Sequence, residues 1–260
     1  YINNIYTKFT KLEALKVKEI ENKTQHDVKA IEYYIKEKIE KNEELKKHKI
    51  QNFVHFALTS QDINSSSYVL SMKQSIQKVI NPNIYSIFNK LLDMSNQWIN
   101  IPILSRTHGQ SASPSLLGKE ILVFIERLDN QIETFKNIKY STKFGGAVGN
   151  LNAHHFARGD IDWLSFVNVF VENRLNLKRN RYTTQIDHYD NYSEIFDCIK
   201  RINTIFIDLC QDIWTYISLN YFILKINTGE VGSSTMPHKV NPINFENAEG
   251  NLLLANNTLA

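Results

Sequence analysis

The stretch GSSTMPHKVNP, residues 232–242, gathers glycine, hydroxyls, a histidine and a lysine within a chain that is otherwise largely helical in pattern. Its backbone N–H groups, two serines and the ammonium of Lys239 suit a carboxylate, which gains from several aligned donors and a fixed cation. A serine hydroxyl is a poor base at neutral pH, so Ser233 would need a closed, electropositive, water-poor pocket. The stretch therefore predicts an anion-binding loop, in which Ser233 is a candidate proton-transfer group only if such a pocket forms around it.

A second reactive stretch is SRTHGQ, residues 105–110, in which His108 lies among serine, arginine and threonine. A histidine in such surroundings can act as a general acid near neutral pH. The alternative is a hydrogen-bonded structural histidine, and the residue types alone leave both interpretations open.

Metal and nucleotide patterns are not found in the sequence. His154 and His155 are adjacent, so they point in different directions, and no HExxH or CxxC spacing occurs. The GGAVGN stretch follows a helical pattern rather than a strand, which argues against a dinucleotide fingerprint. We therefore predict a site without metal or cofactor, built from acidic, basic and anion-binding groups.

The elements that must position these groups are helices separated by four short interruptions. The interruptions are rich in Gly, Ser, Thr, His and Asn and cover residues 54–64, 104–115, 144–155 and 232–242. Loops on a rigid scaffold commonly carry chemistry.

Helical periodicity predicts helices over residues 26–42, 63–80, 81–100, 115–143 and 194–224. In the first, Val28, Ile31, Tyr34 or Ile35, and Ile39 form one apolar stripe. Asn64 and three serines suit an N-cap region of the second helix, and Pro82 suits the first turn of the third. All nine glycines lie at or after Gly109 and Asn-Gly is absent, so we predict an all-α fold without hairpins.

Composition narrows the class of protein further. The 260 residues are 42% hydrophobic, and 30 basic and 27 acidic residues leave a net charge of +3, so no nucleic-acid or membrane partner is indicated. Cys198 and Cys210 lie about 120° apart on a helix and are expected to be buried, reduced thiols. Without a signal peptide pattern, a cytoplasmic location is expected, and the ends of the sequence suggest a fragment cut inside a helix.

The GSSTMPHKVNP stretch resembles the signature of the fumarase/aspartase superfamily. From about Gln25 onward, the stretches HDVKAIEYYIKEK, VHFALTSQDIN, SRTHGQSASPSLLGKE, GGAVGNLNAH and YTTQID together resemble the adenylosuccinate lyase family. The signature alone would also fit another fumarate-releasing enzyme such as argininosuccinate lyase. Long amphipathic helices alone would fit a non-catalytic helical-bundle homologue, but the intact THGQ and GSS stretches argue against it.

The resemblance implies a C–N lyase of purine biosynthesis that uses general acid and base catalysis and no cofactor. It would eliminate fumarate from adenylosuccinate, giving AMP, and from the succinyl carboxamide intermediate SAICAR, giving AICAR. His108 would be the acid and Ser233 the base, and Glu246 would pair with the catalytic histidine. The implied substrate-binding residues are Gln25, His26, Asp27, His55, Thr59, Ser60, Thr107, Gln185, Ser234, Lys239, Asn241 and Asn247.

The resemblance also implies an architecture. Residues 1–60 would end a small N-terminal helical domain, and residues 61–260 would form an incomplete central helical bundle, with the C-terminal domain absent from this chain. Four protomers would join their central helices into a homotetramer, and each active site would draw residues from three chains.

Overall fold

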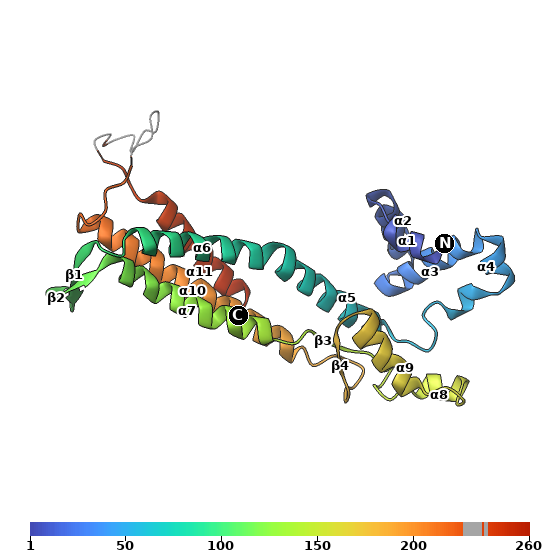
Figure 1. Ribbon diagram of the computed structural model, residues 1–260. Helices are drawn as coiled ribbons and strands as arrows, with labels where there is room; N and C mark the ends of the chain where they lie inside the picture. The colour runs from blue at the N-terminus through green and yellow to red at the C-terminus, as the bar shows by residue number, and fades with distance from the viewer. Residues whose placement is uncertain (226–235, 237–238) are drawn as a thin grey trace. The chain divides into compact units, whose positions relative to one another are not determined.

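The computed structural model describes residues 1–225, 236 and 239–260, which divide into two compact units (Figure 1). Unit 1 comprises Tyr1–Ile76 and Lys139–His188, and unit 2 comprises Gln77–Ile138 and Tyr189–Ala260. Helices dominate both units, and the described residues add two small two-stranded sheets. The predicted helical class is confirmed, whereas the predicted boundary near residue 60 stays a prediction.

Unit 1 consists of short helices and a small parallel sheet. The β3 strand pairs with β4 in parallel, with Ser141 opposite Lys178, and helix α5 packs against β3. Its elements are α1 (Ile2–Thr7), α2 (Lys11–Thr24), α3 (Asp27–Glu40), α4 (Glu43–Lys47), the 3-10 helix η1 (Ile50–Phe53), α5 (Ser60–Ser75), β3 (Ser141–Lys143), α8 (Asn152–Ala157), α9 (Trp163–Val169), the π-helix η3 (Phe170–Arg174) and β4 (Lys178–Asn180).

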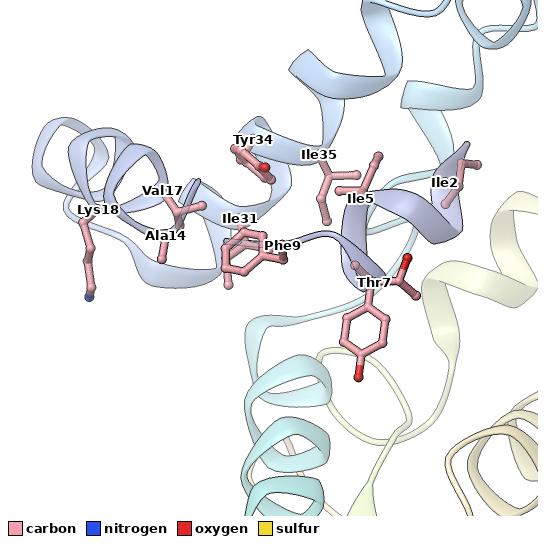
Figure 2. A pocket seen from close by; sticks show the side chains of 11 residues that line it. Ile2, Ile5, Thr7, Phe9, Ala14, Val17, Lys18, Ile31, Tyr34 and Ile35 are labelled. Atoms are coloured by element: carbon pink, nitrogen blue, oxygen red, sulfur yellow. The ribbon is translucent and has the colours of Figure 1, made fainter. Parts of the chain in front are cut away.

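Helix α3 confirms the helix predicted over residues 26–42. Val28, Tyr34 and Ile39 of its predicted apolar stripe are buried. Ile31 is exposed instead, and it lines an apolar groove of about 930 Å³ formed by α1, α2 and α3 (Figure 2).

Unit 2 is built on four helices that pack in sequence: α6 on α7, α7 on α10, and α10 on α11 (Figure 1). Its core lies between α7 and α10, where Leu128 and Ile202 are almost wholly buried. The elements are the π-helix η2 (Ile76–Ile80), which begins at the last residue of unit 1, α6 (Asn81–Gln97), β1 (Pro102–Thr107), β2 (Gln110–Leu116), α7 (Leu117–Asn137), α10 (Asp190–Ser218) and α11 (Ile243–Thr258).

Helix ends differ from the predicted ends where side-chain caps decide them. Helix α5 begins at Ser60 rather than near Asn64, because Thr59 and Asp62 form a reciprocal capping box at its start. Pro82 lies in the first turn of α6, as predicted. The helix predicted over residues 115–143 ends at Asn137, and its last residues form β3 instead. The helix predicted over residues 194–224 runs from Asp190 to Ser218.

The expectation of no hairpin is wrong. Strands β1 and β2 are antiparallel, and Thr107 lies opposite Gln110 across a two-residue turn. His108 and Gly109 occupy this turn with φ values of 52° and 72°. Two-residue hairpin turns with positive φ at both positions favour Asn-Gly, and here histidine takes the first position.

Two smaller expectations concern the cysteines and the membrane. Cys198 and Cys210 are buried and form no disulfide, as predicted, and burial raises the pKa of both thiols. Among the described residues, no helix combines the length and the apolar character that a membrane crossing requires.

Gly118 in the first turn of α7 provides a test of the packing between α6 and α7. A Cβ atom at this position would lie 2.4 Å from the carbonyl oxygen of Ser95 and 2.7 Å from Cα of Ile99. We expect Gly118→Ala to lower the free energy of unfolding by about 1–3 kcal/mol or more, measured by urea denaturation, because backbone atoms must move. Gly159→Ala is the control, since its Cβ would meet only the carbonyl oxygen of His155, at 3.3 Å. Equal losses in both variants would contradict this account.

Candidate active site

The two units each carry part of the predicted site. Unit 1 holds seven of the predicted residues, and unit 2 holds the rest of those that the structure describes. The unit 1 residues are Gln25, His26, Asp27, His55, Thr59, Ser60 and Gln185, and the unit 2 residues are Thr107, His108, Lys239, Asn241, Glu246 and Asn247. Ser233 and Ser234 lie outside the described residues, as does His238.

His26 joins two helices of unit 1 through its ring nitrogens. It is the N-cap of α3, and its Nδ1 accepts a hydrogen bond from the backbone N–H of Lys29 at 3.2 Å. Because Nδ1 accepts, the proton of the neutral ring lies on Nε2. Nε2 is 3.4 Å from Oγ of Ser60, the first residue of α5, and it can donate to that hydroxyl. The structure thus brings together two predicted substrate residues that are 34 positions apart in the sequence.

Asp27 links the same two helices beside His26. Its Oδ1 accepts from the backbone N–H of Val28 at 2.7 Å, and its Oδ2 accepts from Nδ2 of Asn64 in α5 at 3.2 Å. The hydrogen bond from Val28, with a smaller effect from Asn64, lowers the pKa of the Asp27 carboxyl although burial opposes it. The sequence pattern indicates Asn64 only as a capping residue, and nothing in it predicts this contact with Asp27.

A polar hollow of about 490 Å³ lies at the junction of α2 and α3, lined by Glu21, Asn22, Gln25, His26 and Asp27. Gln25 ends α2 in a left-handed conformation with a φ of 52°. This turn places α3 directly after α2, so the three predicted residues at positions 25–27 share one hollow.

Asp62 fixes the backbone on which Thr59 and Ser60 lie. Its Oδ2 accepts from the backbone N–H of Thr59 at 2.9 Å, and its Oδ1 accepts from Nζ of Lys143 at 2.7 Å. The Asp62 and Lys143 side chains are both completely buried. Sequence reasoning missed this ion pair, although the T-x-x-D spacing of TSQD was a capping signal that pointed to Asp62.

Gln185 lies in an exposed segment that a buried carboxylate holds in place. Asp187, two residues further on, accepts from the backbone N–H of Lys143 at 2.9 Å and from Nδ2 of Asn180 at 2.8 Å. Asp187 is buried whereas Gln185 is exposed. The segment is therefore anchored to β3 and β4 while the Gln185 side chain stays accessible.

His55 and His154 are two histidines of unit 1 whose pKa is shifted by burial. Burial lowers the pKa of both imidazoles. His154 packs against the rings of Phe56 and Trp163, with ring centroids 6.2 Å and 5.0 Å away. His55 has a left-handed backbone with a φ of 62°, and its predicted role in substrate binding stays a prediction.

In unit 2, the hairpin turn presents His108 to solvent. Arg106 braces this turn, because its guanidinium donates to the carbonyl oxygen of Gly109 and to the hydroxyl of Tyr221, both at 3.2 Å. The Tyr221 hydroxyl in turn donates to the carbonyl oxygen of Leu104. The hairpin can therefore hold an exposed imidazole at a fixed position.

Glu246 lies in the first turn of α11, and its Oε1 accepts from Nε1 of Trp214 at 3.1 Å. Within the part of the chain that the structure describes, no hydrogen bond or ion pair joins Glu246 to His108. The predicted pairing of Glu246 with the catalytic histidine, in a site that the resemblance builds from several chains, stays a prediction.

The remaining unit 2 residues make local hydrogen bonds. Nζ of Lys239 donates to Oδ1 of Asn241 at 2.8 Å, and Asn247 accepts from Nδ2 of Asn251. Thr107 ends β1, next to His108. Lys239, Asn241 and Asn247 thus lie at and just after the C-terminal end of the signature stretch, and Thr107 lies on the hairpin.

Comparison with known proteins defines the class. A protein family model described as Lyase matches residues 1–255, so this chain belongs to that lyase family. The chain is similar to an adenylosuccinate lyase of Dictyostelium discoideum, with 53% identity over 259 residues. The aligned region covers 98% of this chain and 55% of the relative. The adenylosuccinate lyase of Escherichia coli strain K12 is 46% identical over 259 residues, covering 100% of this chain and 56% of the relative.

A solved structure shows that the fold is shared more widely. The 3-carboxy-cis,cis-muconate lactonizing enzyme from Pseudomonas putida matches with a TM-score of 0.72 at 19% identity, covering 94% of this chain and 53% of that chain. This likeness concerns the fold alone. The chain spans little more than half the length of the curated relatives it matches.

The buried imidazole of His154 predicts a pH dependence of stability. Its pKa is lowered in the folded protein, so the unfolded state binds more protons once the pH falls below about 6.5. We expect the free energy of unfolding to be largest above that pH and to fall on acidification, by at most about 1.4 kcal/mol per pH unit from this group. Urea denaturation between about pH 7.5 and 5.5 measures this slope.

His154→Phe keeps an aromatic ring between Phe56 and Trp163 and should make the slope shallower. His155→Gln alters an exposed neighbour and should keep the slope of the unmodified protein. An unchanged slope in His154→Phe would show that His154 does not contribute to it.

Proposed function

We propose that the full-length protein is an adenylosuccinate lyase of purine nucleotide biosynthesis. The observation that carries this proposal is the identity of 46–53% to adenylosuccinate lyases over nearly the whole chain. The contact between His26 and Ser60 supports it, since it joins two stretches proposed to bind one substrate. The enzyme would convert adenylosuccinate to AMP and fumarate, and SAICAR to AICAR and fumarate, in the cytoplasm and without a cofactor.

The proposed reaction is a β-elimination. Ser233 as base removes a proton from the succinyl Cβ, and the resulting negative charge spreads into the adjacent carboxylate. The C–N bond then breaks, its electron pair stays on the nitrogen, and His108 as acid protonates that nitrogen. Lys239 and Asn241, which contact each other, would bind a carboxylate together with Thr59 and Ser60.

At the nucleotide end, the polar hollow beside α3 supports a binding role for Gln25, His26 and Asp27. Nε2–H of His26, which lies 3.4 Å from Oγ of Ser60, would donate to the phosphate instead once the nucleotide is bound. Gln185 would lie against the substrate near the reacting centre, with Thr107, Ser234, Asn247 and His55 as further contacts.

We further propose a homotetramer in which each active site combines residues from three chains. Two features support this arrangement. The unit 2 helices expose large apolar side chains, among them Leu122 and Val123 on α7 and Leu253 and Leu254 on α11. Such a surface favours burial between subunits. Glu246 also contacts Trp214 rather than His108 of its own chain.

The acid and base assignments predict large losses of activity. In the full-length protein, His108→Ala and Ser233→Ala should each lower kcat by about 10²–10⁴-fold, because each removes a proton-transfer group. Fumarate release from adenylosuccinate measures the rate. His48→Ala, an exposed histidine after α4, is the control and should stay within about twofold.

Losses below about tenfold in both variants would contradict the assigned roles. Turnover of argininosuccinate, without turnover of adenylosuccinate, would instead identify a different lyase of the same superfamily.

The shared site predicts that two inactive variants can complement each other. If His108 and Ser233 of one active site come from different chains, mixing full-length His108→Ala with Ser233→Ala after dissociation and reassociation should restore fumarate release. Some mixed tetramers then contain a site with both groups intact. Size-exclusion chromatography confirms that the mixture reassembles. No recovery in a reassembled mixture would show that both groups belong to one chain.

A further inference from the structure

A buried polar cluster in unit 1 joins three stretches that are far apart in the sequence. They are the turn at Thr59–Asp62, the glycine-rich segment at 143–149 and the segment at 183–187. Lys143 lies at their junction with a completely buried side chain. A buried ammonium is stable only with a close counter-charge and full hydrogen bonding, so this junction tolerates few alternative arrangements.

The carboxylate of Asp62 connects the first two stretches. It accepts from Nζ of Lys143 at 2.7 Å and from the backbone N–H groups of Thr59, Gly145 and Gly146 at 2.8–3.2 Å. Four donors match the roughly four acceptor positions of a carboxylate. Nζ of Lys143 also donates to the carbonyl oxygen of Gly146 at 2.5 Å. The turn that carries Thr59 and Ser60 is thereby bound to the glycine-rich segment.

The third stretch, residues 183–187, also contacts the glycine-rich segment. The backbone N–H of Lys143 donates to Asp187, two residues from Gln185. Gly149 has a φ of 85°, and a Cβ atom there would lie 2.1 Å from the carbonyl oxygen of Thr183. Glycine is therefore required for this close approach, and the glycine-rich segment serves as a contact surface for the chain around Gln185.

We propose that Lys143 and Asp62 are positioning residues of the active site, which set the Thr59–Ser60 turn and the Gln185 segment in one fixed geometry. This inference rests on the proposed function, in which Ser60 and Gln185 bind the substrate. Neither positioning residue touches substrate, because both side chains are fully buried. The glycine-rich stretch, which has no part in the proposed reaction, thereby gains a role as the contact surface between the two substrate-binding segments.

Double-mutant cycles in the full-length protein test the proposal. Lys143→Met removes the ammonium, and we expect kcat/KM for adenylosuccinate to fall at least about tenfold in folded protein, since small displacements of binding groups are costly. In a Ser60→Ala or a Gln185→Ala background, the same change should cause a loss at least about threefold smaller. A positioning residue has less effect once the group that it positions is gone.

Thr142→Val is the matched control. Thr142 is the adjacent residue of β3 and is also fully buried, and its hydroxyl contacts Ser65 and Ser66 of α5 without contacting Asp62. The variant removes buried hydrogen bonds between the same strand and the same helix. In each background, we expect kcat/KM with Thr142→Val to stay within about threefold of kcat/KM in the same background without it.

If Lys143→Met does not fold, Asp62→Asn with Lys143→Met replaces the charged pair by a neutral one, and the same cycles are measured. Equal losses in all backgrounds, no loss at all, or the absence of any folded variant would overturn the proposal and leave the pair a purely structural role. A different result bears on the proposed function: if Ser60→Ala and Gln185→Ala leave kcat/KM unchanged, their assignment as substrate ligands fails.

Discussion

The buried ion pair between Asp62 and Lys143 is the interaction on which the arrangement of unit 1 depends. Both side chains are fully buried, and moving such charges out of water costs several kcal/mol per ion. Three backbone N–H groups and one carbonyl oxygen complete their hydrogen bonding and offset that cost. Because neither charge is stable there alone, the α5 start and the glycine-rich segment must come together as one arrangement.

Features set by neighbouring residues, such as helices, could be predicted from the sequence, whereas contacts between residues far apart in the sequence could not. Apolar spacing located α3 and α10, and Pro82 marked the first turn of α6, because these signals lie within a few residues. Nothing in the sequence near residue 62 or residue 143 indicates that these two residues, which are 81 positions apart, form an ion pair. The hairpin escaped prediction because its turn uses His108 before Gly109 instead of asparagine. The residue types of the signature stretch predicted an anion-binding loop, but the separate roles of Ser233 and Ser234 rested on family resemblance.

Three of the residues proposed for the site have left-handed backbones without being glycine: Gln25, His55 and His108. This conformation costs on the order of 1 kcal/mol or more for such residues, and it persists where surrounding structure enforces it. For Gln25 the enforcing structure is the end of α2, and for His108 it is the hairpin braced by Arg106. The same conformation also occurs outside the proposed site, at Lys49 and Ala57 among others, so it marks fixed turns of the backbone rather than site residues alone.

The proposed site residues Thr59 and Ser60 of unit 1 and His108 of unit 2 differ in their burial. In unit 1, buried charges fix the Thr59–Ser60 turn, whereas in unit 2 the His108 imidazole lies at an exposed hairpin tip. An exposed group gains little from preorganised electrostatics, because water screens it. Elimination from a carbon acid nevertheless demands a dry pocket around the acid and the base. The proposed chemistry therefore requires His108 to be covered by chain beyond its own hairpin, and the sharing of each site among several protomers would supply that cover.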